Sequence, residues 1–391
     1  MHYRVNPELG TEIAALGGGT FTKCFNCGNC TAVCALAKDS AIFPRKTIRC
    51  LQLGLSDRLL ESPEPWLCYY CGTCSDTCPR EAEPGELMMA ARRWLTTRYD
   101  FTGLSERLYR SELWEIGSLA AIALVVLGFF LVPGLFGVTF GFQAVQGPAL
   151  EHVRLDLFAR KEWIHIGDLV LAGLLFALLG TNTLRMARFI RRGEPDLKIP
   201  LSIWIAKLWD FGVHAATQRR WLDCDTDTRL LWLKHFLLVT GYATMLLLVV
   251  VFLPWFQRDG ADFHFTALFG YYGTVMLLAV TLLAIRGRLK KNVQLHKHSH
   301  VTDWMFLVLL FLTALSGIVL HAFRLLDWPW PTYVTYVVHL MIAVPMLIIE
   351  VPFGKWLHLG FRPMAQYLSA VIEAARAQQA AGEGRQPAAA A

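Results

Sequence analysis

The residues with the clearest chemical potential are the cysteines. Nine of the ten lie before residue 80, and eight of these form two groups with the same internal spacing. The groups are Cys24-x2-Cys27-x2-Cys30-x3-Cys34, followed by Ala35, and Cys68-x2-Cys71-x2-Cys74-x3-Cys78, followed by Pro79. Three closely spaced thiolates with a fourth further along are typical ligands of a [4Fe–4S] cluster. The repeat therefore predicts two such clusters.

The fourth cysteine of each group is expected to bind the cluster of the other group, as in bacterial ferredoxins with this spacing. The predicted ligand sets are Cys24, Cys27, Cys30 and Cys78 for one cluster, and Cys68, Cys71, Cys74 and Cys34 for the other. A zinc site needs only four ligands and would not require this repeated three-plus-one spacing. Disulfides are disfavoured in a reducing cytoplasm. Cys50 and Cys224 lie outside both groups, and we expect them to be packing residues.

Hydropathy divides the 391 residues into a mixed part and an apolar part, since long apolar stretches run from about Leu113 to Trp356. We expect a mainly α-helical protein with a cytoplasmic ferredoxin-type domain at 1–105, a six-helix membrane domain at 106–365 and a C-terminal tail at 366–391. The tail is rich in Ala, Gln and Gly after about Ala374, which predicts disorder towards its end. The start of the chain lacks the apolar core of a signal peptide.

Six segments reach the roughly 20 apolar residues that a membrane-spanning helix needs. They are residues 113–133, 163–184, 231–254, 266–286, 303–323 and 333–353. Arg and Lys flank the same ends of these segments, whereas the loops 134–162, 255–265 and 324–332 carry fewer positive charges. The positive-inside rule then predicts a multi-pass protein of the cytoplasmic membrane, surrounded by lipid, with both termini and the cluster domain in the cytoplasm. This distribution explains the net charge of +6 without nucleic acid binding.

Residues 202–220 combine Trp and aliphatic residues with polar ones. This pattern predicts an amphipathic helix that lies on the inner membrane surface or docks a partner protein. His214 within it is expected to be a surface histidine.

Histidines near the predicted helix ends are candidate haem ligands, because haem b needs two axial ligands at one depth in the membrane. On the cytoplasmic side, His235 and His358 can form such a pair. On the opposite side lie His165, His339 and His321. The row His296, His298 and His300 is expected to be a solvated loop, with His300 as a reserve ligand. Histidines that only anchor helix ends are the alternative interpretation.

His339 and His358 are 19 residues apart and are expected on one helix, which separates them by about 28 Å. This separation suits two haems stacked across the bilayer. On an ideal helix the two side chains would diverge, but Pro345 and Pro352 lie between them and can kink the helix.

Two resemblances now become specific. Residues 20–95, with FPRKTIRCLQLGLSDRLL and WLCYYCGTCSDTCPREAEPGELMMAARR, resemble the small iron–sulfur subunit of heterodisulfide reductase. Residues 160–365 resemble the nitrate reductase gamma family of cytochromes b, most clearly in VVHLMIAVPMLIIEVPFGKWLHLGFRP. That resemblance implies that His339 and His358 bind different haems, and that His235 in LLWLKHFLLVTGY is the partner of His358.

The family's second histidine on the helix of His235 is missing here, where the sequence reads Tyr242 to Met245. A second haem would then use His165 or His321 beside His339, or Met245 as a weaker possibility, or be absent.

The order of the two modules resembles the membrane-embedded component of the quinone-interacting membrane-bound oxidoreductases of sulfate reducers. That resemblance implies menaquinone as the membrane substrate and two partner flavoproteins similar to the flavin-containing subunit of heterodisulfide reductase. It also implies adenylylsulfate (APS) reductase as the functional partner in sulfate respiration. The chain would then be one redox subunit of a larger enzyme, relaying electrons between menaquinol and the flavoproteins through haem b and the two clusters.

The sequence also allows other functions. The same relay could serve a sulfite-reduction or heterodisulfide reductase membrane complex. A redox-gated transporter or sensor is a different class, and it predicts a polar stripe through the helices and no haem. Asp168, Asp303 and Glu350 are acidic residues near helix ends and are only guesses for a quinone site.

Overall fold

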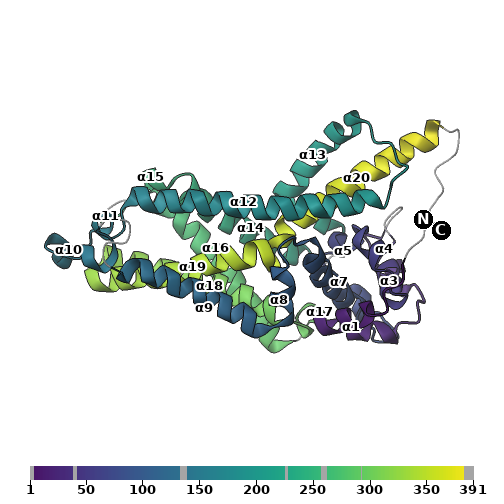
Figure 1. Cartoon of the computed structure of the whole chain (residues 1–391), viewed down its shortest axis with the longest axis horizontal. Helices are drawn as coiled ribbons and strands as arrows, with labels where there is room; N and C mark the ends of the chain where they lie inside the picture. The colour runs from purple at the N-terminus through teal and green to yellow at the C-terminus, as the bar shows by residue number, and fades with distance from the viewer. Residues whose placement is uncertain are drawn as a thin grey trace.

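The structure is a computed structural model that describes residues 4–37, 42–132, 139–224, 228–256, 262–291 and 293–382. Within these ranges the regular elements are all helices, and no strand occurs. The mainly α-helical prediction is therefore confirmed. Figure 1 shows the short helices of the N-terminal domain gathered at one end of a bundle of long helices.

The N-terminal domain is built from short helices around one long one. They are α1 (Leu9–Ile13), α2 (Asn29–Ala32), α3 (Arg45–Gln52), α4 (Ser56–Leu60), α5 (Glu64–Leu67), α6 (Thr73–Asp76), α7 (Pro84–Tyr99) and α8 (Leu104–Arg110). Helix α7 is the centre of the domain, because fourteen of its sixteen residues are buried. Pro84 begins it at a position where the missing N–H costs no helical hydrogen bond.

In the described part of the chain, six helices are long and apolar enough to cross a membrane, as the hydropathy predicts. They are α9 (Glu112–Leu131), α12 (Lys161–Arg192), α14 (Thr228–Val250), α16 (Ala267–Lys290), α18 (Val301–Leu325) and α19 (Pro329–Phe353). These spans indicate a multi-pass membrane protein. The predicted residue 133, parts of the loops 134–162 and 255–265, and the tail at 383–391 lie outside the described residues.

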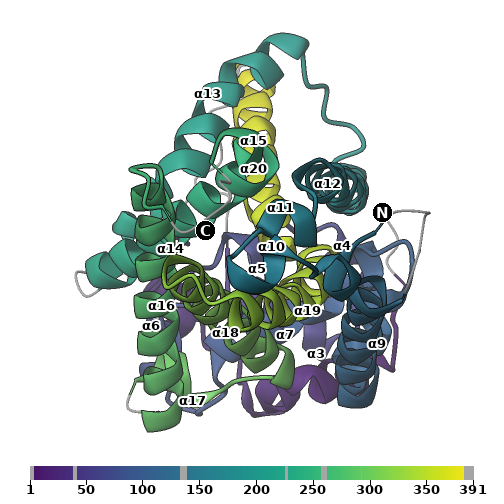
Figure 2. The same cartoon turned by 90° about the vertical axis from the view of Figure 1, so that its left-hand side faces the viewer.

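The long helices pack in the order α9, α19, α18, α16, α14, with α12 against both α19 and α14 (Figure 2). The short helices α10 (Pro148–Glu151), α11 (Leu155–Phe158) and α15 (Leu253–Phe256) lie at the end far from the N-terminal domain (Figure 1). There Phe158 stacks on Tyr333 with ring centroids 4.6 Å apart. This aromatic packing fixes the far ends of α9, α12 and α19 against one another.

Helix α13 (Leu201–Thr217) coincides with the predicted amphipathic helix and packs along α20 (His358–Gly382). None of its residues is buried, and Trp209 is 77% exposed. The short α17 (Gln294–Lys297) connects α16 to α18 beside the N-terminal domain.

The structure corrects the expectation that His339 and His358 share a helix. Helix α19 ends at Phe353, and Gly354 adopts the non-helical angles φ −105° and ψ −145°. A side chain at Gly354 would collide with the Glu350 carboxylate, which occupies the space beside it. After a short turn at Lys355–Leu357, His358 begins the separate helix α20. The break follows Pro352, which cannot donate the helical hydrogen bond of its own turn.

Helix α20 also continues to Gly382, past Ala374 where the composition predicts a disordered tail. Val371, Ile372 and Ala375 are buried on one face of this helix, and Arg376 pairs with Glu194 after α12. Ala, Gln and Glu are strong helix formers, so a composition that favours disorder in an isolated tail favours a helix once one face is packed.

A buried ionic network fastens the N-terminal domain to the membrane helices. Arg93 on α7 donates to Glu86 at 2.7 Å and to Asp303 of α18 at 2.8 Å, and all three side chains are nearly inaccessible to solvent. Asp303 also pairs with Lys355, in the turn between α19 and α20. The burial of these charges is tolerated because each has a partner.

We predict that Arg93→Gln destabilises the protein by about 3–5 kcal/mol, because it leaves the buried Glu86 carboxylate without a cation and leaves Asp303 with Lys355 alone. Thermal unfolding of the purified protein measures this loss, and limited proteolysis reports release of the N-terminal domain. The matched control is Arg98→Gln, since Arg98 forms a 2.8 Å pair with Glu12 that is about a third exposed. That variant should lose about 1 kcal/mol or less. Equal losses in the two variants would contradict the assignment of Arg93.

Candidate metal centres

The two cysteine groups adopt the same backbone turn. In the first, Asn26 and Gly28 have φ of 60° and 90°, and in the second, Tyr70 and Gly72 have φ of 57° and 96°. Each turn sends a backbone N–H to the first sulfur of its group, since Asn26 donates to Cys24 and Tyr70 donates to Cys68, both at 3.3 Å. A glycine is needed at the second position, because an L side chain rarely adopts that φ. The repeat in the sequence is thus a repeat in structure.

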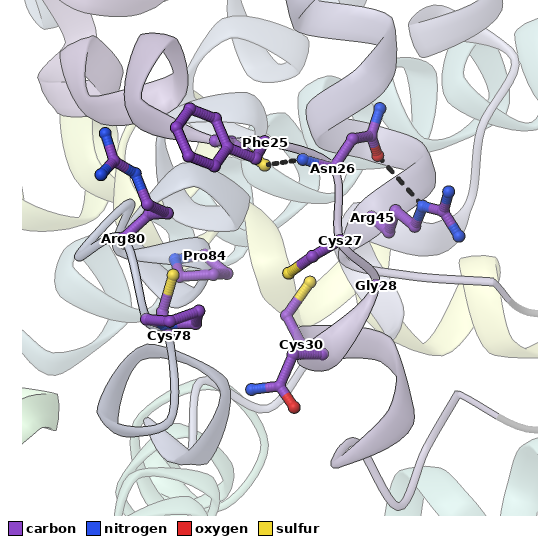
Figure 3. A pocket seen from close by; sticks show the side chains of 12 residues that line it. Phe25, Asn26, Cys27, Gly28, Cys30, Arg45, Cys78, Arg80 and Pro84 are labelled. Carbon is purple, nitrogen blue, oxygen red and sulfur yellow. Dashed lines mark hydrogen bonds between the residues drawn. The ribbon is translucent and has the colours of Figure 1, made fainter.

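The first predicted set lines a single pocket. Cys24, Cys27, Cys30 and Cys78 face this pocket together, and Figure 3 shows the sulfurs of Cys27, Cys30 and Cys78 directed into the same space. The turn is held by Arg45, whose Nε donates to the Asn26 side chain at 3.1 Å. Cys78 also accepts a hydrogen bond from the Ala82 N–H at 3.4 Å. Residues of both groups therefore converge as the ferredoxin spacing predicts.

The second predicted set also brings together residues of both groups. Cys34 is close enough to Cys68 and Cys71 for their charges to affect its thiol, and Cys74 is similarly close to all three. The two groups are joined by the Asn29 side chain, which donates to the Thr77 carbonyl at 2.7 Å. Helices α2 and α6, one after each turn, pack against each other.

The four thiols of the first set surround one common pocket, as the ligands of a single cluster would. No three His, Cys, Asp or Glu side chains of the described residues converge as closely as the ligands of one metal ion do. A cube with iron at four of its corners needs thiolates spread around a larger common space, and the pocket provides that arrangement. The first set therefore fits the cluster predicted for it, and the cysteines of the second set lie near one another as a second cluster would require.

Burial keeps several of these thiols protonated while no cluster is bound. It raises the pKa of Cys30 to about 11, aided by the nearby Cys24, Cys27 and Cys78. Burial likewise raises the pKa values of Cys34, Cys68 and Cys74. Because the thiolate is the ligand, cluster binding must release these protons.

Cys224 lies beside the second set, which the sequence did not reveal. It follows the turn Arg219–Asp223 between α13 and α14, and the proximity of its thiol lowers the pKa of Cys71. Such a contact can stabilise the thiolate of a cluster ligand. Cys50, by contrast, is buried in the core of the N-terminal domain, which agrees with a packing role.

The two sets differ in exposure. Cys27 is exposed, and its neighbour Phe25 is 70% exposed beneath the Arg80 guanidinium, 4.1 Å from the ring centroid. In the second set Cys68 and Cys74 are buried, and Tyr69 beside Cys68 faces the membrane helices. The first set therefore lies at the surface, and the second lies between it and the membrane domain.

The rings of His235 and His358 lie next to each other and are inclined by 63°. Their ring centroids are 6.3 Å apart, although they come from different helices, α14 and α20. An iron bound to one nitrogen of each ring needs two bonds of about 2 Å. The remainder of the 6.3 Å is accounted for by the distances from the two bonded nitrogens to their ring centroids. The pair therefore fits a haem iron between the two rings.

An aromatic bridge connects this histidine pair with the second cysteine set. Trp221 lies 5.0 Å from the ring centroid of His235 and 5.0 Å from that of Tyr69, the neighbour of Cys68. Arg362, one turn after His358 on α20, places its guanidinium 3.9 Å from the Tyr69 ring centroid. Sequence reasoning missed Trp221 and Arg362, and only the spacing of Arg362 from His358 could have indicated a shared helix face.

The remaining predicted haem ligands lie towards the far end of the bundle. His339 shares a hydrogen bond of 2.9 Å between its Nδ1 and Ser316 on α18. The Nε2 of His321 is 2.8 Å from the Tyr271 hydroxyl, whereas the Nδ1 of His165 has no hydrogen-bond partner among the described residues. Met245 packs its sulfur against Gly273 of α16.

Several other predicted residues have structural partners. Asp303 belongs to the Arg93 network, and Glu350 lies buried against Glu115 of α9 and the turn at Gly354. Asp168 is half-buried on α12. The His214 ring lies 3.4 Å from the Tyr69 hydroxyl, so it is a domain contact and not a surface histidine.

The row His296, His298 and His300 is half-buried against the N-terminal domain, which corrects its interpretation as a solvated loop. His300 caps α18 by accepting a hydrogen bond from Thr302, and its ring lies 6.1 Å from that of Tyr109. Gln294, two residues before His296, donates a hydrogen bond to Glu83 of the N-terminal domain.

The matches to known proteins that follow cover only the N-terminal part of the chain, at most 28% of it. Residues 20–82 match the 4Fe-4S dicluster domain family. A protein of Archaeoglobus profundus similar to the C-type subunit of heterodisulfide reductase is 38% identical over 112 residues, which is 28% of this chain and 59% of the relative. The C-type iron–sulfur subunit of the CoB–CoM heterodisulfide reductase of Methanopyrus kandleri is 33% identical over 96 residues, which is 22% of this chain and 50% of the relative.

The C-type subunit of the H2:CoB-CoM heterodisulfide,ferredoxin reductase of Methanothermobacter thermautotrophicus is 32% identical over 88 residues, 22% of this chain and 48% of the relative. The chain thus spans about half the length of the curated relatives it matches. No solved structure matches it. The N-terminal part is a 4Fe–4S dicluster domain similar to these iron–sulfur electron-transfer subunits.

Paired substitutions test the prediction that the fourth cysteine of each group binds the cluster of the other group. Cys78→Ser with Cys27→Ser should remove one cluster, because both residues belong to the first set. Cys78→Ser with Cys71→Ser should remove both clusters, because the two residues belong to different sets. Non-haem iron should therefore fall from about eight atoms to about four in the Cys78/Cys27 variant and to none in the Cys78/Cys71 variant. Iron analysis and electron paramagnetic resonance (EPR) of the reduced protein measure the outcome, with Cys50→Ser as the control. The reverse pattern would show that each group keeps its own fourth cysteine.

Proposed function

We propose that the chain is the membrane electron-transfer subunit of a quinone-interacting oxidoreductase. It passes electrons between menaquinol in the membrane and cytoplasmic flavoprotein partners through haem b and two [4Fe–4S] clusters. The observation that carries the proposal is the order of three sites: the His235–His358 pair, the second cysteine set with its buried Cys68 and Cys74, and the first set with its exposed Cys27. A relay needs this order, from a membrane site to a surface where a partner can dock.

The chemistry comes from the groups that the chain holds, because haem iron and iron–sulfur clusters exchange single electrons whereas a quinol delivers two. The chain's own residues set positions. His235 and His358 hold the haem nearer the cluster domain, and Trp221 with Tyr69 fills the space between that site and Cys68 with aromatic side chains. The Arg93 network keeps this spacing constant.

A second haem would be held by His339 with His165. The hydrogen bond to Ser316 fixes the orientation of the His339 ring and leaves its Nε2 for iron. Gly317 on the same face of α18 lets the helix approach His339 closely, since an added Cβ would lie 3.3 Å from the ring. His165 is preferred to His321, because Tyr271 already engages the Nε2 of His321.

The identity of the partners rests on resemblance. The order of the modules supports two flavoproteins similar to the flavin-containing subunit of heterodisulfide reductase, with APS reductase as functional partner in sulfate respiration. The names of the relatives favour a second candidate, a relay in a heterodisulfide reductase complex. Under either candidate the cluster domain and both termini lie in the cytoplasm. Co-purification from the native membrane separates the two, because APS reductase and a heterodisulfide-cleaving protein are different partners.

Reduced-minus-oxidised spectra of the purified protein test the proposal, together with haem and iron analysis and addition of a menaquinol analogue. We expect two haems, about eight non-haem irons and rapid reduction of haem by the quinol. Protein that contains no haem would overturn the membrane half of the proposal and would favour a transporter or sensor instead.

Single histidine substitutions should assign the haems. His235→Ala and His358→Ala should each remove the same haem, because each deletes one of two facing ligands. His339→Ala and His165→Ala should remove the other, while the matched control His321→Ala keeps both. Haem content and the optical spectrum of each variant give the result. Retention of both haems in His235→Ala would exclude that residue as a ligand.

A further inference from the structure

Hydrogen-bond donors without partners gather beside the His235–His358 pair. The Nε1 of Trp221 and one terminal nitrogen of Arg362 are buried and donate to nothing in the described part of the chain. The Trp221 side chain is only 8% exposed. Donors left unpaired in such a place cost free energy, so their presence indicates a missing acceptor.

The charge around these donors is positive. Arg362 acts electrostatically on His235, His358 and Tyr69, and Arg220 acts on Tyr69 as well. Neither arginine forms an ion pair with a carboxylate within the described residues. Arg362 is half-buried, and its inaccessible terminal nitrogen has neither a carboxylate nor another acceptor beside it among the described residues. A cationic donor in this position favours an anion, so we take the missing acceptor to be negatively charged.

The donors also share one location. Arg362 lies four residues after His358 on α20 and therefore faces the same side of that helix. Its guanidinium is 6.0 Å from the Trp221 ring centroid, and Trp221 is 5.0 Å from the His235 ring centroid. The anion thus belongs next to whatever the two histidines hold.

We propose that Arg362 and Trp221 donate hydrogen bonds to a propionate carboxylate of the haem held by His235 and His358. This inference rests on the proposed function. A carboxylate satisfies both orphan donors and neutralises Arg362, and an Arg–carboxylate hydrogen bond is among the stronger ones in proteins. The site directs the polar edge of the haem towards the N-terminal domain, where the second cysteine set lies.

Two other anions compete for Arg362. The second cluster with its four thiolates is itself negative, and Arg362 lies over Tyr69 beside Cys68. A phospholipid phosphate is the other competitor, since α20 packs against the exposed helix α13. The three anions predict different effects of removing the arginine.

The experiment compares Arg362→Gln, Arg362→Lys and Trp221→Phe in the complete purified protein with its bound cofactors. The control is Arg376→Gln, which removes a charge from the same helix outside the site. Haem content per chain is measured first. Optical and EPR titrations then give the midpoint potentials of the haem and of each cluster.

We expect Arg362→Gln to bind less of the haem assigned to His235 and His358 and to shift its midpoint potential downward, because a nearby positive charge stabilises the reduced iron. Trp221→Phe should shift it in the same direction by less, and Arg362→Lys should restore most of the wild-type value. The cluster potentials and the control variant should be unchanged.

An unchanged haem potential and content in Arg362→Gln would overturn the inference. A shift confined to the second cluster would assign Arg362 to that cluster, and loss of bound phospholipid without a change in the haem would assign it to lipid. Either result leaves the proposed function intact. A wild-type protein without this haem, or a His358→Ala variant that keeps it, would instead refute the proposed function.

Discussion

The constraint on which the structure depends is that Arg93 must be paired where it lies. The guanidinium is buried between the N-terminal domain and the membrane helices, and its charge is balanced there by the carboxylates of Glu86 and Asp303. Lys355 completes the network from the turn that precedes His358. Because an unpaired buried charge is so costly, the two domains have one favourable relative position. The interface is thus defined by charge as well as by apolar packing.

The consequences of this position reach both predicted cofactor regions. Lys355 lies in the turn that ends α19 and starts α20, so the network also fixes where His358 begins its helix. On the other side, α7 carries Arg92, which donates to the Cys68 carbonyl and so ties the network's own helix to the second cysteine set. The same ionic contacts therefore help to keep the rings of Tyr69, Trp221 and His235 in contact, one after the other. A change in domain docking would alter the spacing between membrane and cluster sites.

Much of this organisation could be predicted from the sequence. The cysteine spacing has one simple geometric meaning, and the six hydropathic segments fall on the six long helices because length and apolarity alone define a span. Depth in the membrane and a family resemblance also indicated that His235 and His358 lie near each other, as their rings do. In each case a local pattern carries the information.

The remaining features depend on contacts between distant segments. The break at Gly354 needs the Glu350 carboxylate that fills its side-chain space, and the helix after Ala374 needs a packed face. Cys224 and Trp221 reach the cysteine and histidine sites only because the segment between α13 and α14 folds over them. Asp303 was a guess for a quinone site and is instead an ion-pair partner of an arginine 210 residues away.

The central claim is that a haem between His235 and His358 stands beside the second cluster. Low-temperature EPR of the partly reduced protein tests it, because two nearby paramagnetic centres broaden each other's signals. The account predicts that the ferric haem signal lost in His358→Ala is broadened when the second cluster is reduced. A haem signal that is insensitive to the redox state of that cluster would contradict the account.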